Sequence, residues 1–206
     1  MIKNALIYLL GCLSFSLGAT FFILSNMGTD PLDVFCLGVQ NYFNIKIGTI
    51  QSIFAVICLI IYSAMNRWKI PPWSPFLTFF ICGYATDYFR HILTDLEVSP
   101  IASMLSGSAL CLYGSSLIIL SGIGIRAMDL IAFSLEEKTG VKFWIHKGII
   151  ETCLLSTGYI LGGPIGIGTV VFLVVVGWLI EIVLRINKWI FGIEILNYNG
   201  KLIESK

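Results

Sequence analysis

Six long apolar stretches, separated by short polar segments, dominate the pattern of the chain. A helix of about 17–25 apolar residues is long enough to cross a bilayer core of about 30 Å. The pattern therefore predicts an all-α membrane protein with six transmembrane helices. These spans cover roughly residues 5–26, 48–66, 75–93, 101–121, 144–162 and 167–186.

Two further segments have a helical pattern but are too short and too polar to be obvious spans. One covers residues 30–44, after the first span, and the other covers residues 126–139, after the fourth span. We expect each of them to form a short interrupted or re-entrant helix.

The positions of lysine and arginine test the number of spans independently, because cytoplasmic loops carry an excess of both residues. With the N-terminus in the cytoplasm, six crossings leave only Lys46 and Arg90 of the 13 lysines and arginines outside. If both short helices also crossed, giving eight spans, Arg67 and Lys69 would move outside and the bias would weaken. We therefore expect both termini in the cytoplasm, with residues 191–206 as a cytoplasmic tail.

One phrase occurs twice, 96 residues apart, each time directly after a long apolar run. It covers residues 25–33 and 121–129, and in each copy an aspartate follows a glycine by five residues. The residues paired at this offset include Gly11 with Gly107, Gly18 with Gly114, Gly28 with Gly124 and Asp33 with Asp129. The chain therefore divides into two related halves, residues 1–96 and 97–190.

The number of crossings in each half decides how the halves are related in space. Each half contributes three crossings, an odd number, so the second half begins on the opposite face and the repeats are inverted. In secondary transporters, inverted repeats with interrupted helices place a binding site near the midplane, between the halves. The two phrases therefore indicate where a solute site is expected.

Composition and charge narrow the classes of function. Hydrophobic residues make up 57% of the chain and charged residues 12%, far from the usual range of soluble domains. A net charge of +1 offers no basic surface for nucleic acid. The six cysteines show no CxxC spacing and the two histidines are isolated, so we expect neither a metal site nor a cofactor. We also expect no enzyme, because no phosphate-binding loop or nucleophile motif is present.

Asp33 and Asp129 have two interpretations. Asp30 followed by Pro31 is typical of a helix N-cap, which places Asp33 in the first turn, where a carboxylate stabilises the helix dipole. Asp129 follows Arg126 at the same spacing. In the second interpretation, the two short helices enter the membrane from opposite faces and their first turns bind a solute or a cation. One residue can serve both purposes.

The candidate solute site follows from the second interpretation. Its members are Gly28, Asp33, Gly124, Arg126, Asp129 and Glu151. Glu151 lies in the fifth predicted span, where a carboxylate is costly unless it is paired, protonated or hydrated. It can pair with Lys147 at i−4 or face the interior of the bundle, and it is the candidate proton or cation partner.

Two other acids and one glycine-rich tract are weaker candidates. Asp87 lies one turn before a basic pair, and Glu181 lies four residues before Arg185, so ion pairs near the interfaces are favoured for both. Residues 161–169 connect the fifth and sixth spans without any charge. This tract is either a turn that permits close helix packing or a backbone-lined neck at the outer face.

These motifs resemble the YczE/YyaS/YitT family of bacterial multi-pass membrane proteins, and its YczE/YyaS branch in particular. The resemblance covers roughly residues 8–185 and is carried by residues 28–34 and 124–130, Glu151 and residues 161–169. Members often have Trp where this chain has Leu32 and Arg where it has Lys147. The resemblance implies a bacterial cytoplasmic-membrane protein and leaves the activity undefined, because the family is largely uncharacterised.

Two hypotheses for the function follow. The first is a small secondary transporter or permease of an unknown small solute, with a central site between inverted repeats and with proton or cation coupling. The second is a membrane-embedded binding or accessory subunit of another transport, export or biosynthetic system. The expected partners are the lipid bilayer and a small solute, with a homo-oligomer or an accessory complex as further candidates.

Overall fold

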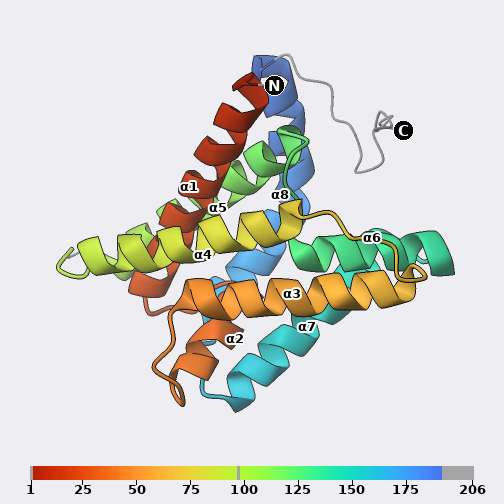
Figure 1. Ribbon diagram of the computed structural model, residues 1–206. Helices are drawn as coiled ribbons and strands as arrows, with labels where there is room; N and C mark the ends of the chain where they lie inside the picture. The colour runs from red at the N-terminus through yellow and green to blue at the C-terminus, as the bar shows by residue number, and fades with distance from the viewer. Residues whose placement is uncertain (1, 97, 192–206) are drawn as a thin grey trace.

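The structure is a computed structural model that describes residues 2–96 and 98–191, apart from the side chains of residues 175–178, 181, 188 and 191. Every regular element in this described part is an α-helix, and Figure 1 shows how the helices cross one another. They are α1 (Ile2–Leu24), α2 (Pro31–Gln40), α3 (Ile47–Met65), α4 (Ser74–Ile92), α5 (Pro100–Leu120), α6 (Ala127–Thr139), α7 (Phe143–Ile160) and α8 (Ile167–Phe191).

Three of these helices, α1, α3 and α5, are long and apolar enough to cross a membrane within the described residues. The other predicted spans also form helices, since α4, α7 and α8 contain 19, 18 and 25 residues. However, α4 contains Asp87 and Arg90, and α7 contains Lys147 and Glu151, so neither is uniformly apolar. The all-α fold and the three apolar helices are confirmed, and the total of six crossings stays a prediction.

The long helices alternate in direction along the chain. In Figure 1, α1, α4 and α7 run toward the lower left, whereas α3, α5 and α8 run toward the top or the right. Contacts agree with this view for α1 and α4, which lie parallel, because Tyr8 contacts Thr78 near their starts and Thr20 contacts Thr86 further along. Helices α3 and α4 are antiparallel, because Gly48 at the start of α3 lies against the later part of α4.

The short helices α2 and α6 lie at the two predicted positions. Helix α2 packs on α7 and on α3, and helix α6 packs on the same two helices and also on α4. Asp30 is the N-cap of α2 and accepts a hydrogen bond from the Asp33 backbone N–H at 2.6 Å, with Pro31 in the first turn. The predicted N-cap role of Asp30 is therefore confirmed, whereas the Asp33 carboxylate accepts a hydrogen bond from the Gln51 side chain rather than from the helix backbone.

Helix α6 begins and ends differently. Arg126 occupies its N-cap position but makes no side-chain capping hydrogen bond. Gly140 ends the helix in the left-handed conformation, with a φ of 71°, which glycine adopts without a steric penalty. Asp129 therefore lies in the first turn of α6, as Asp33 lies in the first turn of α2.

The buried apolar residues form two clusters, one on each side of α4. The first fills the space between α1, α4 and α5, around Phe15 and Phe22, and also includes Phe172 of α8. The second fills the space between the short helices, α3, α4 and α7, around Phe79 and Leu154.

Candidate functional site

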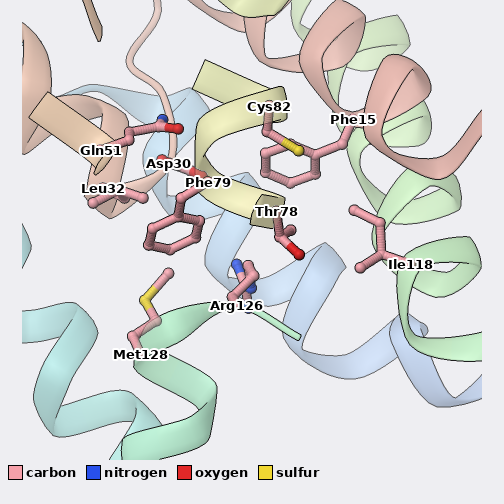
Figure 2. Close-up of a pocket in the computed structure, with 10 residues that line it drawn as sticks. All are labelled: Phe15, Asp30, Leu32, Gln51, Thr78, Phe79, Cys82, Ile118, Arg126 and Met128. Carbon is pink, nitrogen blue, oxygen red and sulfur yellow. The ribbon is translucent and has the colours of Figure 1, made fainter. Parts of the chain in front are cut away.

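A small cavity lies where the two halves of the chain meet, as Figure 2 shows. It has room for about one water molecule. Its walls come from four long helices and from the starts of both short helices. The lining residues are Phe15, Asp30, Leu32, Gln51, Thr78, Phe79, Cys82, Ile118, Arg126 and Met128.

Asp30 and Arg126 bring opposite charges to this cavity from the two repeated phrases. Each is the N-cap residue of its short helix, and the two positions are 96 residues apart. Both are shielded, since Asp30 is 5% exposed and the Arg126 side chain is 13% exposed. Asp30 was not among the predicted site residues, because its position before Pro31 predicts only a capping role. The structure brings the starts of both short helices to one cavity.

Asp33 is not among the lining residues, but it is hydrogen-bonded to one of them, Gln51, and is 1% exposed. The Gln51 amide donates a hydrogen bond to its Oδ1 at 3.0 Å. Its Oδ2 receives no hydrogen bond from any residue that the structure describes. A buried carboxylate oxygen without a donor is costly, so this atom is unusual in the fold.

Asp129 has the opposite environment, because two cations contact it. Arg126 donates from Nε at 2.9 Å and from Nη2 at 3.3 Å, and the Lys147 ammonium donates at 3.1 Å. Lys147 also pairs with Glu151 at 3.1 Å. The predicted i−4 pairing of Glu151 is therefore confirmed, and Glu151 is 9% exposed, so it faces the interior as well. The four charged side chains therefore form one continuous network of ion pairs from Arg126 to Glu151.

The two aspartates have equivalent partners in the two halves. Gln51 lies 18 residues after Asp33, and Lys147 lies 18 residues after Asp129. Gln51 and Lys147 are themselves 96 residues apart, so the repeat extends into α3 and α7. Gln51 was not among the predicted site residues, although the same offset from Lys147 leads to it.

The two predicted glycines serve close packing. Gly28 has a φ of 98°, and a Cβ atom there would lie 2.6 Å from the Thr169 hydroxyl. A Cβ atom on Gly124 would collide with the Tyr8 ring. The glycine-rich tract packs on the first phrase, because the Gly168 N–H donates to the Met27 carbonyl at 2.7 Å. These contacts favour the close-packing interpretation of that tract.

Two other acids lie apart from this site or outside the described part. Asp87 accepts hydrogen bonds from the backbone N–H groups of Ile47 at 3.1 Å and Gly48 at 2.8 Å, so it caps the start of α3. This contact replaces the expected ion pair within α4, since Arg90 donates to the Gln40 side chain instead. The side chain of Glu181 lies outside the described residues, and its expected pair with Arg185 stays a prediction.

Comparison with known proteins identifies the family. Residues 2–185 match a family of unknown function, DUF6198. The chain belongs to this family. It is 27% identical over 176 residues to the uncharacterized membrane protein YczE of Bacillus subtilis, covering 84% of this chain and 78% of YczE. It is 26% identical over 189 residues to the uncharacterized protein YyaS of the same organism, covering 87% of this chain and 91% of YyaS.

A third relative extends the similarity to another bacterium. An uncharacterized protein of Haemophilus influenzae is 24% identical over 177 residues, covering 82% of this chain and 78% of the relative. No solved structure matches the chain. The predicted resemblance to YczE and YyaS is confirmed, and the protein is a membrane protein of a family whose activity is undefined.

Proposed function

We propose that this protein is a small secondary transporter or permease of a small solute, with its binding site at the cavity between two inverted halves, which would widen from its one-water volume when a solute enters. The observation that carries the proposal is that Asp30 and Arg126, at equivalent positions of the two halves, line one buried cavity. Fixed charges at helix starts inside a membrane are costly, so they are retained where they bind solutes or ions.

The arrangement of the helices supports inverted repeats. Helices α1 to α4 of the first half are equivalent to α5 to α8 of the second half, in the same order. The contact of α1 with α4 is thus matched by the contact of α5 with α8. The pairing of α2 with α7 corresponds in the same way to that of α6 with α3. Two pairs depart from this rule within the described residues. Helix α4 packs on α3 and on α6, whereas α8 makes no comparable contact with α7 or α2, and the Gly-rich segment after α7 packs on α2 instead.

Six crossings also agree with the alternating directions of the long helices in Figure 1. In this arrangement α2 enters from the outer face and α6 from the cytoplasmic face, and both termini lie in the cytoplasm. The expected location is the bacterial cytoplasmic membrane. The two short helices would then place the positive ends of their dipoles toward the centre of the bundle, where a solute could reach them alternately from each side.

Uptake into proteoliposomes that contain only this chain tests the proposal. The probes are amino acids, small carboxylates, small amines and monosaccharides, each with a proton gradient or a sodium gradient. Asp30→Asn keeps an N-cap side chain but removes the charge, so we expect it to reduce uptake roughly tenfold to hundredfold. Asp95→Asn, on the exposed loop after α4, is the matched control and should transport normally.

The outcomes separate the two functional hypotheses. Gradient-driven uptake that Asp30→Asn removes supports a transporter. Saturable binding without uptake would contradict the transporter hypothesis and favour the second one, a membrane-embedded binding or accessory subunit of another system. Equal uptake by Asp30→Asn and by the unmodified protein would show that the cavity is not the solute site.

A further inference from the structure

The two halves carry different charges at equivalent positions around their buried aspartates. Where the second half has Arg126 at the N-cap of its short helix, the first half has Asp30. Where the second half has Lys147 as the partner of its aspartate, the first half has neutral Gln51. The first half therefore lacks both cations that the second half supplies to its aspartate.

This difference leaves an excess of negative charge in the first half. In the second half, Arg126 and Lys147 balance Asp129 and Glu151. In the first half, Asp30 and Asp33 lie next to each other, since the backbone N–H of Asp33 donates to the Asp30 carboxylate at 2.6 Å. Arg126 lines the same cavity as Asp30, but its guanidinium is hydrogen-bonded to Asp129.

Among the residues that the structure describes, no cation lies within hydrogen-bonding distance of Asp33. Arg90 of α4 donates to the Gln40 side chain, and the Asp87 carboxylate of α4 accepts a backbone hydrogen bond from the start of α3. Gln51 of α3 supplies only an amide. The titratable and charged groups around Asp33 and Asp30 are Cys36 of α2, Cys82, Asp87 and Arg90 of α4, Cys111 of α5, Arg126 before α6, and Lys147 and Glu151 of α7.

We propose that Asp33, next to Asp30, binds one exchangeable proton, which takes the place that Lys147 fills permanently in the second half. The acceptor is Asp33 Oδ2, which is buried and receives no hydrogen bond from the described residues. The step is an acid–base equilibrium: an O–H bond forms at Oδ2 with a proton from water, and it breaks when the proton returns to water. The role of this proton as the coupling ion rests on the proposed transport function.

The contacts favour a proton over a metal ion. One oxygen of each carboxylate already accepts an N–H group, from Gln51 at Asp33 and from the backbone at Asp30. A metal ion needs several oxygen ligands at once, whereas a proton needs a single oxygen.

Thermal unfolding of the purified full chain in detergent, measured at a series of pH values, tests proton binding without requiring transport. The folded protein should hold one more proton than the unfolded chain, so its stability should fall as the pH rises and the proton is released. We expect the midpoint to fall by roughly 3 °C or more between about pH 5 and about pH 8. Asp33→Asn, which imitates the protonated side chain, should lose most of this fall.

Two further variants guard against a simple folding defect. Gln51→Lys copies the second half by placing an ammonium beside Asp33, and it should also flatten the pH dependence. Asp129→Asn is the matched variant in the second half, and it should keep the fall with pH whatever its overall stability. In infrared spectra, the unmodified protein at low pH should show a buried carboxylic acid band that is absent from Asp33→Asn.

The proposal is overturned if Asp33→Asn keeps the full pH dependence and the acid band. It is also overturned if sodium chloride, compared with choline chloride at constant pH, stabilises the unmodified protein but not Asp33→Asn, because the ligand would then be sodium. Proton binding at Asp33 without any solute uptake would leave this inference standing and remove the transport function. Solute uptake together with no pH dependence from Asp33 would overturn this inference and leave the transport function standing.

Discussion

Gly18 of α1 lies directly against Gly107 of α5, so that a Cβ atom on Gly18 would come within 2.8 Å of the Gly107 carbonyl oxygen. The reciprocal pair, Gly11 and Gly114, makes the equivalent contact, and a Cβ atom on Gly114 would come within 2.7 Å of the Gly11 carbonyl oxygen. Small residues allow membrane helices to approach until their backbones touch. The antiparallel crossing of α1 and α5 is thus built from residues that the 96-residue offset relates.

Replacement of Gly18 by alanine should destabilise the protein, because the added methyl group meets backbone atoms of α5 that cannot move independently. We expect a loss of about 1–3 kcal/mol, the usual cost of overpacking. Thermal unfolding in detergent is the measurement. Gly148→Ala in α7 is the control, since a Cβ atom there meets nothing within 4 Å and alanine favours the helix. Equal stability of the two variants would contradict the close approach.

Lys147→Met should destabilise the protein more than Glu151→Gln. Loss of the ammonium leaves Glu151 without its ion pair and leaves Asp129 with Arg126 alone, whereas the neutral amide of Glu151→Gln leaves Lys147 still paired with Asp129. Because Lys147 is 19% exposed, the cost should be about 1–3 kcal/mol, below that of a fully buried pair. The double variant should recover part of the loss in thermal unfolding. An additive double variant would show that Lys147 and Glu151 are not coupled.

Asp87→Ala should cost about 1–2 kcal/mol, because the carboxylate caps two backbone N–H groups at the start of α3. Asp87→Asn should retain part of this stability, since an amide oxygen can still accept a hydrogen bond from the same groups. Unfolding midpoints in detergent distinguish these cases, with Asp95→Asn as an exposed control. If Asp87→Asn were as unstable as Asp87→Ala, charge rather than capping would explain the effect.

Labelling of single cysteines in whole cells with a membrane-impermeant reagent tests the six crossings. Cysteines placed at Asn44 and Asp95, both exposed, should react from outside. Cysteines at the exposed Lys69 and Lys142 should react only after the membrane is permeabilised. The background is Cys153→Ser, because the other five native cysteines are buried. Labelling of Lys69→Cys from outside would contradict the predicted topology and therefore also the inverted orientation of the two halves.

Accessibility along the two repeated phrases tests the re-entrant helices. Cysteines scanned through residues 28–36 and 124–132 should react poorly at buried positions such as Asp33 and Asp129, which are 1% and 7% exposed. Uniform labelling from bulk solvent would contradict entry of these segments into the bundle. Addition of a bound solute should protect the positions next to the cavity more than those at the far end of each short helix.

The sequence by itself determined the helices and their repeat. Apolar stretches and the Asp30–Pro31 start mark local boundaries, because hydropathy and capping depend on neighbouring residues. The observed short helices begin at residues 31 and 127, within one residue of the predicted starts. The 96-residue offset also indicated which positions are equivalent.

Only the tertiary structure decided which side chains meet. The structure, and not the sequence, shows that Gln51 lies beside Asp33 and that Asp87 caps the start of α3. It also shows that Asp30, rather than Asp33, lines the cavity. Each of these contacts joins segments whose separation along the chain carries no local signal. They depend on how α3, α4 and the short helices pack, and that packing is fixed by close approach between helices rather than by the pattern of any single one.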